Sequence, residues 1–248
     1  MLHDLHQSGS MRVLFPRPES PPTAMLLNTA GGITGGDKFH IAGRAETGTH
    51  LTMTTQAAER VYAANSNTVG TVYTQLQVED TAGIWWLPQE TILFDNSALS
   101  RSLDVALDGY AEALIVEPLV FGRAASGEVL QNCALHDRVR ITRNGVPVYA
   151  DGIALNSPAQ AQLAHPAIAD GAGAMATLIL AGPRAEAALP QVRARIAQNS
   201  GTVAGASLLS DEMLVFRALA ADSFVLRQLL LPILDDLTGG RLPICWRL

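Results

Sequence analysis

The sequence has few cysteines, few aromatic residues and no long apolar run, and each shortage excludes a class of protein. Its two cysteines, Cys133 and Cys245, lie far apart and form no CxxC pair, so we expect two reduced thiols in a cytoplasmic protein. No uninterrupted apolar run approaches the roughly 18 residues of a membrane span. The N-terminal residues also lack the apolar core of a secretory signal.

Positive charge is sparse as well. The chain carries 17 Lys and Arg against 23 Asp and Glu, and its basic residues are scattered rather than gathered into a stripe. This distribution argues against a nucleic-acid-binding protein. Hydrophobic residues make up 48% of the 248 residues, enough for a sizeable core. We therefore expect one globular domain over residues 1–248.

Strand-like alternation dominates the first two thirds of the chain. In residues 72–79, apolar side chains and Thr74 share one face while polar side chains share the other, which is typical of a half-buried strand. The same repeat returns at 103–108 and at 139–148, the latter with an Asn144-Gly145 hairpin turn. Short strands about ten residues apart predict an antiparallel sandwich, a barrel or a β-solenoid.

Helical periodicity is found only near the C-terminus. Residues 188–201 place Leu189, Val192 and Ile196 on one face and end at a glycine. A second apolar segment, 224–237, follows Asp222 or Ser223 as a possible N-cap. It fits either a core helix or a surface for partner proteins. We predict a mainly β fold with many short strands in a β-helix or solenoid-like body, and two α-helices toward the C-terminus within residues 185–237.

The most constrained stretch is NTAGGITGGD at residues 28–37, where four glycines indicate a turn with a tightly specified path. Glycine-rich turns can bind phosphate through their backbone amides. Here the last glycine is followed by Asp37 rather than by the Lys-Ser or Lys-Thr of a Walker loop, and no GxGxxG is present. We therefore predict a structural turn rather than a nucleotide site.

Motifs of catalysis or of tight metal binding are missing from the sequence. There is no GxSxG elbow, and Cys133 and His136 are close only along the chain. The six histidines form no HExxH and no close cluster away from the N-terminus. Glu117 lies in an apolar run, where it could be a tuned acid or a structural carboxylate. Scattered carboxylates of this kind could hold a divalent ion weakly.

Six further segments form a recognisable series along the chain. They are LFPR (14–17), LLNTAGGITGGD (26–37), TTQAAERVY (54–62), WLPQETILF (86–94), FGR with the following GE (121–128) and LPICW (242–246). Taken in this order, they resemble the UreD family of urease accessory proteins, called UreH in some organisms. Family members usually have a further strand-forming segment before the DLHQSG region, and Thr29-Ala30 replaces the usual proline-glycine.

This resemblance implies a non-catalytic scaffold with a β-helical body. Such a protein would work with UreF, with the nickel-carrying GTPase UreG and with apo-urease, and would pass nickel through an internal tunnel. No tightly bound cofactor is implied, only transient nickel. The resemblance points to Asp37, Glu117 and Asp151 as acidic tunnel-lining positions, with Glu59 as a fourth.

Each of these residues also has a structural interpretation. Asp37 could brace the glycine turn, Asp151 could close the loop before Gly152, and Glu59 could pair with a surface cation. We expect Asp37→Ala or Glu117→Ala to lower nickel loading of urease while complex assembly stays intact.

Two other functions fit parts of the sequence. One is a β-solenoid enzyme acting on a polysaccharide, although an aromatic content of 5% is low for sugar-stacking surfaces. The other is a plain interaction module without metal transit. Binding to UreF would separate a urease scaffold from the enzyme, and nickel loading by the Asp37 and Glu117 variants would separate it from the plain module.

Overall fold

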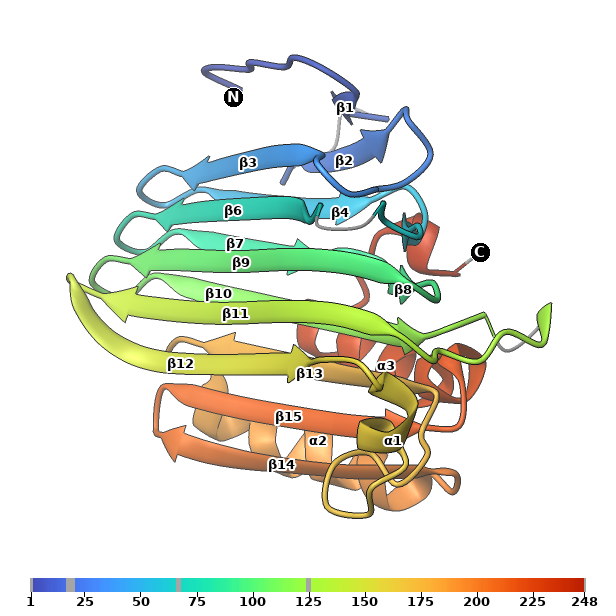
Figure 1. The fold of residues 1–248 in the computed structure, drawn as a ribbon. Coiled ribbons are helices and arrows are strands. Elements are labelled where there is room, and N and C mark those ends of the chain that lie inside the picture. Colours follow the sequence, from blue (N-terminus) through green and yellow to red (C-terminus); the bar gives the residue numbers. More distant parts are fainter. Residues whose placement is uncertain (1, 17–20, 66–67, 124–125, 248) are drawn as a thin grey trace.

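Two β-sheets face each other and are wound by one continuous chain (Figure 1). The computed structural model describes residues 2–16, 21–65, 68–123 and 126–247. The sequence PRPESPP at residues 16–22, whose four prolines predict a connector, falls largely on residues 17–20, outside the described residues. The prediction of a mainly β, solenoid-like body is confirmed.

Sheet A, the rear layer in Figure 1, has ten strands among the described residues. They are β1 (Met11–Leu14), β2 (Thr23–Asn28), β4 (His50–Thr55), β5 (Glu59–Val61), β7 (Gly83–Leu87), β8 (Thr91–Leu93), β10 (Glu112–Phe121), β13 (Ala174–Ala181), β14 (Thr202–Ser210) and β15 (Met213–Ala220).

Sheet B, the front layer, has five strands in the same part of the chain. They are β3 (Lys38–Ala45), β6 (Gly70–Val78), β9 (Ser97–Leu107), β11 (Cys133–Arg143) and β12 (Val146–Leu155).

The solenoid arises because the chain alternates between the sheets. In sheet A, β2, β4, β7 and β10 are parallel, and in sheet B, β3, β6, β9 and β11 are parallel. Inward side chains therefore stack in rows, as where Leu103 lies in register with Thr74 and Val139. Antiparallel strands extend both ends, and β12 joins β11 through the predicted Asn144-Gly145 turn, whose two residues have positive φ.

Both predicted helices are present, as α2 (Ala185–Gln198) and α3 (Ser223–Thr238), and pack on the outer face of sheet A. The Asp222 side chain accepts a hydrogen bond from the Val225 N–H at 2.9 Å, so Asp222 is the N-cap of α3. The sequence reading missed one short helix, α1 (Ala159–Leu163), because five residues are too few to show a helical period.

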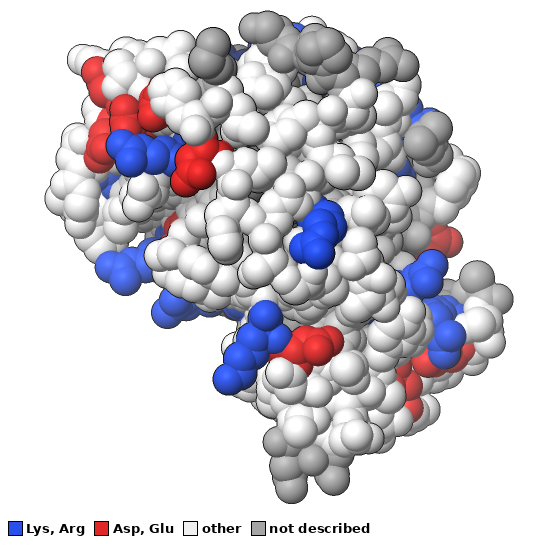
Figure 2. Space-filling view, turned by 90° about the horizontal axis from the view of Figure 1, so that it is seen from above, with Lys and Arg blue, Asp and Glu red and all other residues white. Residues whose placement is uncertain are grey.

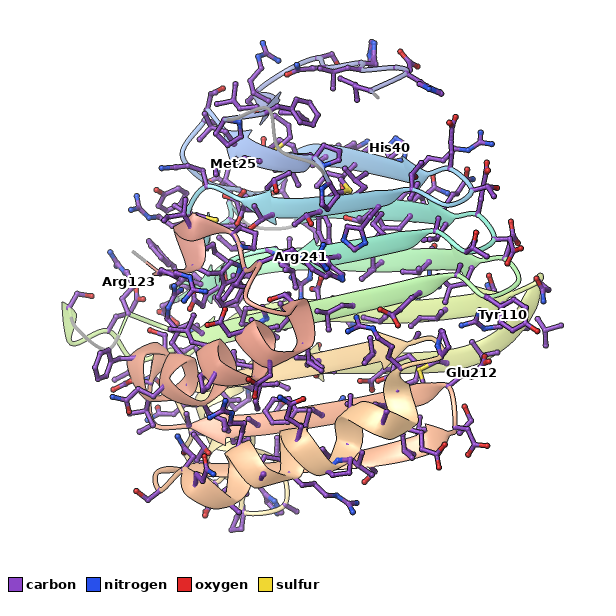
Figure 3. All side chains as sticks on the ribbon, turned by 180° about the vertical axis from the view of Figure 1, so that it is seen from behind. Met25, His40, Tyr110, Arg123, Glu212 and Arg241 are labelled. Atoms are coloured by element: carbon purple, nitrogen blue, oxygen red, sulfur yellow. The ribbon has the colours of Figure 1, made fainter. Side chains whose placement is uncertain are left out.

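The C-terminal tail covers the part of sheet A that α3 leaves open. Trp246, in the 3-10 turn η2 (Ile244–Arg247), is fully buried and its Nε1 donates to the Leu87 carbonyl at 2.9 Å. Seen from behind in Figure 3, Arg241 lies between α3 and this tail, and its guanidinium stacks over the Trp85 ring. Tyr110 and Glu212 lie at one end of the strands, and Arg123 at the other.

Leucines of α3 belong to the core between sheet A and the helices, as the core-helix interpretation expects. Leu229, Leu230 and Leu234 are buried there with Phe216, whereas Phe224 at the start of the helix is exposed. Most of the apolar surface of 224–237 is therefore used for folding.

Candidate functional site

The space between the two sheets holds two apolar clusters separated by a polar band. One cluster includes Leu76 and Val105, and the other includes Leu99 and Leu135. Between them lies a group of buried polar side chains from both sheets, namely Thr91, Arg101, Glu117, Asp137 and Thr177. Buried charges in an apolar interior are costly unless they are paired, so this band is the first place to look for function.

Arg101 is at the centre of the band. Its Nε and Nη2 donate to the two carboxylate oxygens of Asp137 at 3.0 and 2.5 Å, and Nη1 donates to Thr91 at 3.2 Å. Nη2 also lies 2.5 Å from Oε2 of Glu117. One buried guanidinium therefore contacts two buried carboxylates, from β10 of sheet A and β11 of sheet B.

Glu117 is held by two different partners. The Trp86 indole Nε1 donates to its Oε1 at 2.5 Å, whereas Oε2 makes the ion pair with Arg101 but accepts no hydrogen bond from the described residues. Burial raises the pKa of the Glu117 carboxyl, the Arg101 charge opposes this rise, and the Asp137 charge adds to it.

A cavity of about 230 Å3 opens beside this carboxylate. Its wall is mostly apolar and comes from both sheets, with Leu26, Ile41, Val72, Leu99 and Leu103 among its residues. Its polar wall consists chiefly of Asn28, Glu59, Thr74, Gln89, Arg101 and Glu117.

Glu59 faces the same cavity from β5. Its two carboxylate oxygens accept hydrogen bonds from the Asn28 amide at 3.2 and 3.3 Å. Burial raises its pKa, and the Asn28 hydrogen bond acts in the opposite direction. The structure thus brings two of the four predicted residues, Glu59 and Glu117, to one cavity.

Asp151 lies on the same polar band, farther along the solenoid. Glu117 is in register with Thr177 of β13, which is in register with Arg217 of β15. Arg217 donates to Thr177 at 3.3 Å and forms an ion pair with Asp151 of β12. Asp151 therefore joins sheet B to sheet A at the open edge of the sandwich, and it does not line the cavity.

Asp37 braces the glycine turn. Its Oδ2 accepts a hydrogen bond from the Thr34 N–H at 2.9 Å, and it is not among the cavity residues. The turn passes close to β5, where Ile33 pairs with Val61 and a Cβ on Gly32 would collide with Tyr62 and the Arg60 carbonyl. As metal contacts, Asp37 and Asp151 stay predictions.

Sequence reasoning missed Arg101, Asp137 and Trp86. The sequence held a signal for two of them, because side chains two residues apart in a strand share one face. Arg101 is therefore on the same face as the inward Leu103, and Asp137 is on the same face as Val139 and Ile141. A charged residue at an inward position of a strand predicts a buried ion pair. Nothing in the sequence shows that β9, β10 and β11 bring these residues together.

The other candidate catalytic and metal-binding side chains do not come together in the described part of the chain. Cys133 is buried beside Ser97, where burial raises the pKa of its thiol, while His136 is exposed on the outer face of β11. In the described part of the chain, no group of three or more His, Cys, Asp and Glu side chains is placed to hold a metal ion. The oxygen atoms of the cavity are hard ligands, and two carboxylates without imidazole or thiolate fit weak rather than tight nickel binding.

Comparison with known sequences identifies the family. The sequence model described as UreD urease accessory protein matches residues 1–245. The chain belongs to the UreD family. It is 51% identical to the urease accessory protein UreD of Ruegeria sp. (strain TM1040), over 100% of this chain and 84% of that protein. Identity is 48% to the UreD of Ruegeria pomeroyi, over 99% and 94% of the two chains, and 41% to that of Rhizobium leguminosarum bv. viciae, over 100% and 89%.

Membership of the UreD family bears on one of the open alternatives. The relatives are named as urease accessory proteins, so this chain is an accessory protein rather than a polysaccharide enzyme. The family name does not separate a scaffold that passes nickel from a plain interaction module. The described helices include none long and apolar enough to cross a membrane.

Proposed function

We propose that this UreD-family chain is a cytoplasmic scaffold that assembles with UreF, UreG and apo-urease and passes nickel through its interior to the urease active site. The observation that carries this proposal is the cavity between the two sheets, whose lining includes both Glu59 and Glu117. Two carboxylates that face one cavity provide oxygen ligands for a divalent ion.

The ligand chemistry supports transit over storage. Nickel binds more tightly to imidazole and thiolate than to carboxylate oxygen, and the polar wall offers oxygen atoms and amides beside the positively charged residues Arg60 and Arg101. The polar band continues from Glu117 through Thr177 to Arg217 and Asp151. It therefore supports a route along the solenoid axis, at right angles to the strands.

The test is nickel loading of urease when this chain is co-expressed with urease, UreF and UreG at limiting nickel. Glu117→Gln and Glu59→Gln each remove a carboxylate while keeping its size, and we expect several-fold less nickel per urease. Glu186→Gln is the matched control, because Glu186 is exposed in the first turn of α2. Asp37→Ala tests the glycine turn separately.

Co-purification of UreF, UreG and urease is measured in the same samples. Lower loading with intact assembly supports transit. Normal loading by both cavity variants would refute it and leave a plain scaffold, whereas lost assembly would assign the residues to folding or partner contact.

A further inference from the structure

The buried carboxylates of the polar band already have a cation, and that cation belongs to the protein. Arg101 carries one permanent positive charge, because a guanidinium is not deprotonated in proteins. Its side chain is 11% exposed, and those of Glu117 and Asp137 are 7% and 6% exposed. A metal ion that approaches these carboxylates must therefore compete with a charge fixed in place.

The competition is unequal at the two carboxylates. Both carboxylate oxygens of Asp137 accept hydrogen bonds from Arg101, one from Nε and one from Nη2. This bidentate geometry is the strong form of an arginine–carboxylate pair. Glu117 is held less completely, since Arg101 contacts only its Oε2, through Nη2 at 2.5 Å, and its side chain lines the cavity. An incoming ion would share Glu117 first, while Asp137 stays bound to Arg101.

We propose that Arg101 is a resident counter-ion that competes with a divalent cation for the Glu117 carboxylate at the cavity wall, so that the cation is held weakly and released. The physiological importance of this role rests on the proposed nickel transit. Nickel binding by the purified chain can be measured whether or not that transit occurs. Thr91 supports the role by accepting a hydrogen bond from Nη1, which helps to hold the guanidinium in place.

The test is nickel binding by the purified full-length chain, measured by titration with nickel sulfate and by the rate of release to a chelator. Arg101→Gln leaves two buried carboxylates without a cation, and we expect nickel affinity to rise by about tenfold or more, because the ion no longer meets a fixed positive charge a few ångströms away. Release should slow correspondingly. Arg101→Lys retains the charge and should stay close to the wild type.

Two further variants make the result specific. Arg195→Gln is the matched control, because Arg195 makes a bidentate pair with Asp236 between α2 and α3, away from the cavity. It should bind nickel as the wild type does. The double variant Arg101→Gln with Glu117→Gln should lose the gained affinity, because it lacks the oxygen that the ion would share.

A folded Arg101→Gln protein that binds nickel no more tightly than the wild type would overturn the proposal. If Arg101→Gln does not fold, the comparison is Asp137→Asn against Arg101→Met with Asp137→Asn, which removes the ion pair as a unit. Tighter nickel binding by the double variant supports the proposal, and equal binding overturns it. Normal urease loading by Glu117→Gln would refute nickel transit but would not change these binding results.

Discussion

The indole of Trp86 and the carboxylate of Glu117 meet inside the molecule, with Nε1 2.5 Å from Oε1. Trp86 is the last residue but one of β7, next to the parallel strand β10, and the two side chains point into the space between the sheets. This bond satisfies a buried donor and a buried acceptor at once, so it fixes the carboxylate that faces the cavity.

A double-mutant cycle on this pair should give a coupling of about 1–3 kcal/mol, the range for a hydrogen bond to a carboxylate. The variants are Trp86→Phe, Glu117→Met and their combination, since Met has no oxygen to accept from the indole, and the measurement is the free energy of unfolding in urea. The destabilisation caused by the smaller Phe ring is present with and without the Glu117 substitution, so it cancels in the cycle. Additive single effects would show that the bond contributes nothing to stability.

Arg227→Met should destabilise the fold by about 3 kcal/mol, because it leaves the buried Glu90 carboxylate without its cation. Arg227 Nη1 lies 2.9 Å from Oε1 of Glu90, and Nη2 donates to the Trp246 carbonyl at 2.6 Å. Urea unfolding and proteolysis of the C-terminal tail would measure the effect.

Its matched control is Arg247→Met, since Arg247 belongs to the same tail but its ion pair with Asp235 is largely exposed. A loss below about 1 kcal/mol is expected there. Equal losses for the two variants would show that burial of the Arg227 pair is unimportant.

Removing the N-cap of α3 should cost about 1 kcal/mol. Asp222→Ala deletes the acceptor for the Val225 N–H, whereas Ser223→Ala, one residue along, deletes no capping bond. Thermal unfolding of the two variants provides the comparison. The interpretation fails if Ser223→Ala is as destabilising as Asp222→Ala.

Stability should fall as the pH is lowered from about 6.5 to about 4 because of His50. Burial, with smaller effects from the Arg241 and Arg184 charges, lowers the pKa of His50 from 6.5 to about 4. The unfolded chain therefore binds a proton at a higher pH than the folded chain does, so this contribution is complete above 6.5 and is lost on acidification. The ring lies edge-on to Trp85, and its buried Nε2 has no hydrogen-bond partner among the described residues.

Urea midpoints at pH 7.5 and pH 5 would measure this dependence in the wild type, in His50→Gln and in His136→Gln. His136 is exposed on β11, so its variant should keep the wild-type pH dependence. His50→Gln should show a smaller difference between the two pH values. An unchanged difference would exclude His50 as its source.

Much of the charge on this protein is solvated and carries little information about function. Seen from above, the end of the solenoid is largely uncharged, and acidic and basic side chains lie beside one another at its left edge (Figure 2). The exposed Arg44–Glu79 pair is of this type and lies at the strand ends. Arg101 differs from such residues only in the direction of its side chain.

Local patterns predicted the elements because each depends on neighbours in the sequence. Two-residue alternation located β6, β9 and β11, and Asn144-Gly145 located the β11–β12 turn. A helical period with a glycine stop located α2, and an N-cap located the start of α3. The parallel pairing of sheet B was not readable, since alternation is the same in parallel and antiparallel strands. For Glu59 and Glu117, the sequence supplied the residues but no reason for them to face one cavity.

The sequence by itself determined that the chain is mainly β, where its strands, turns and two longer helices lie, and that its glycine-rich stretch is no phosphate loop. These follow from side-chain period, capping and turn chemistry, which act over a few residues. Only the tertiary structure decided that Arg101 reaches both Glu117 and Asp137. That contact joins strands 16 to 36 residues apart through sheet register and the gap between the sheets, and no local pattern encodes it.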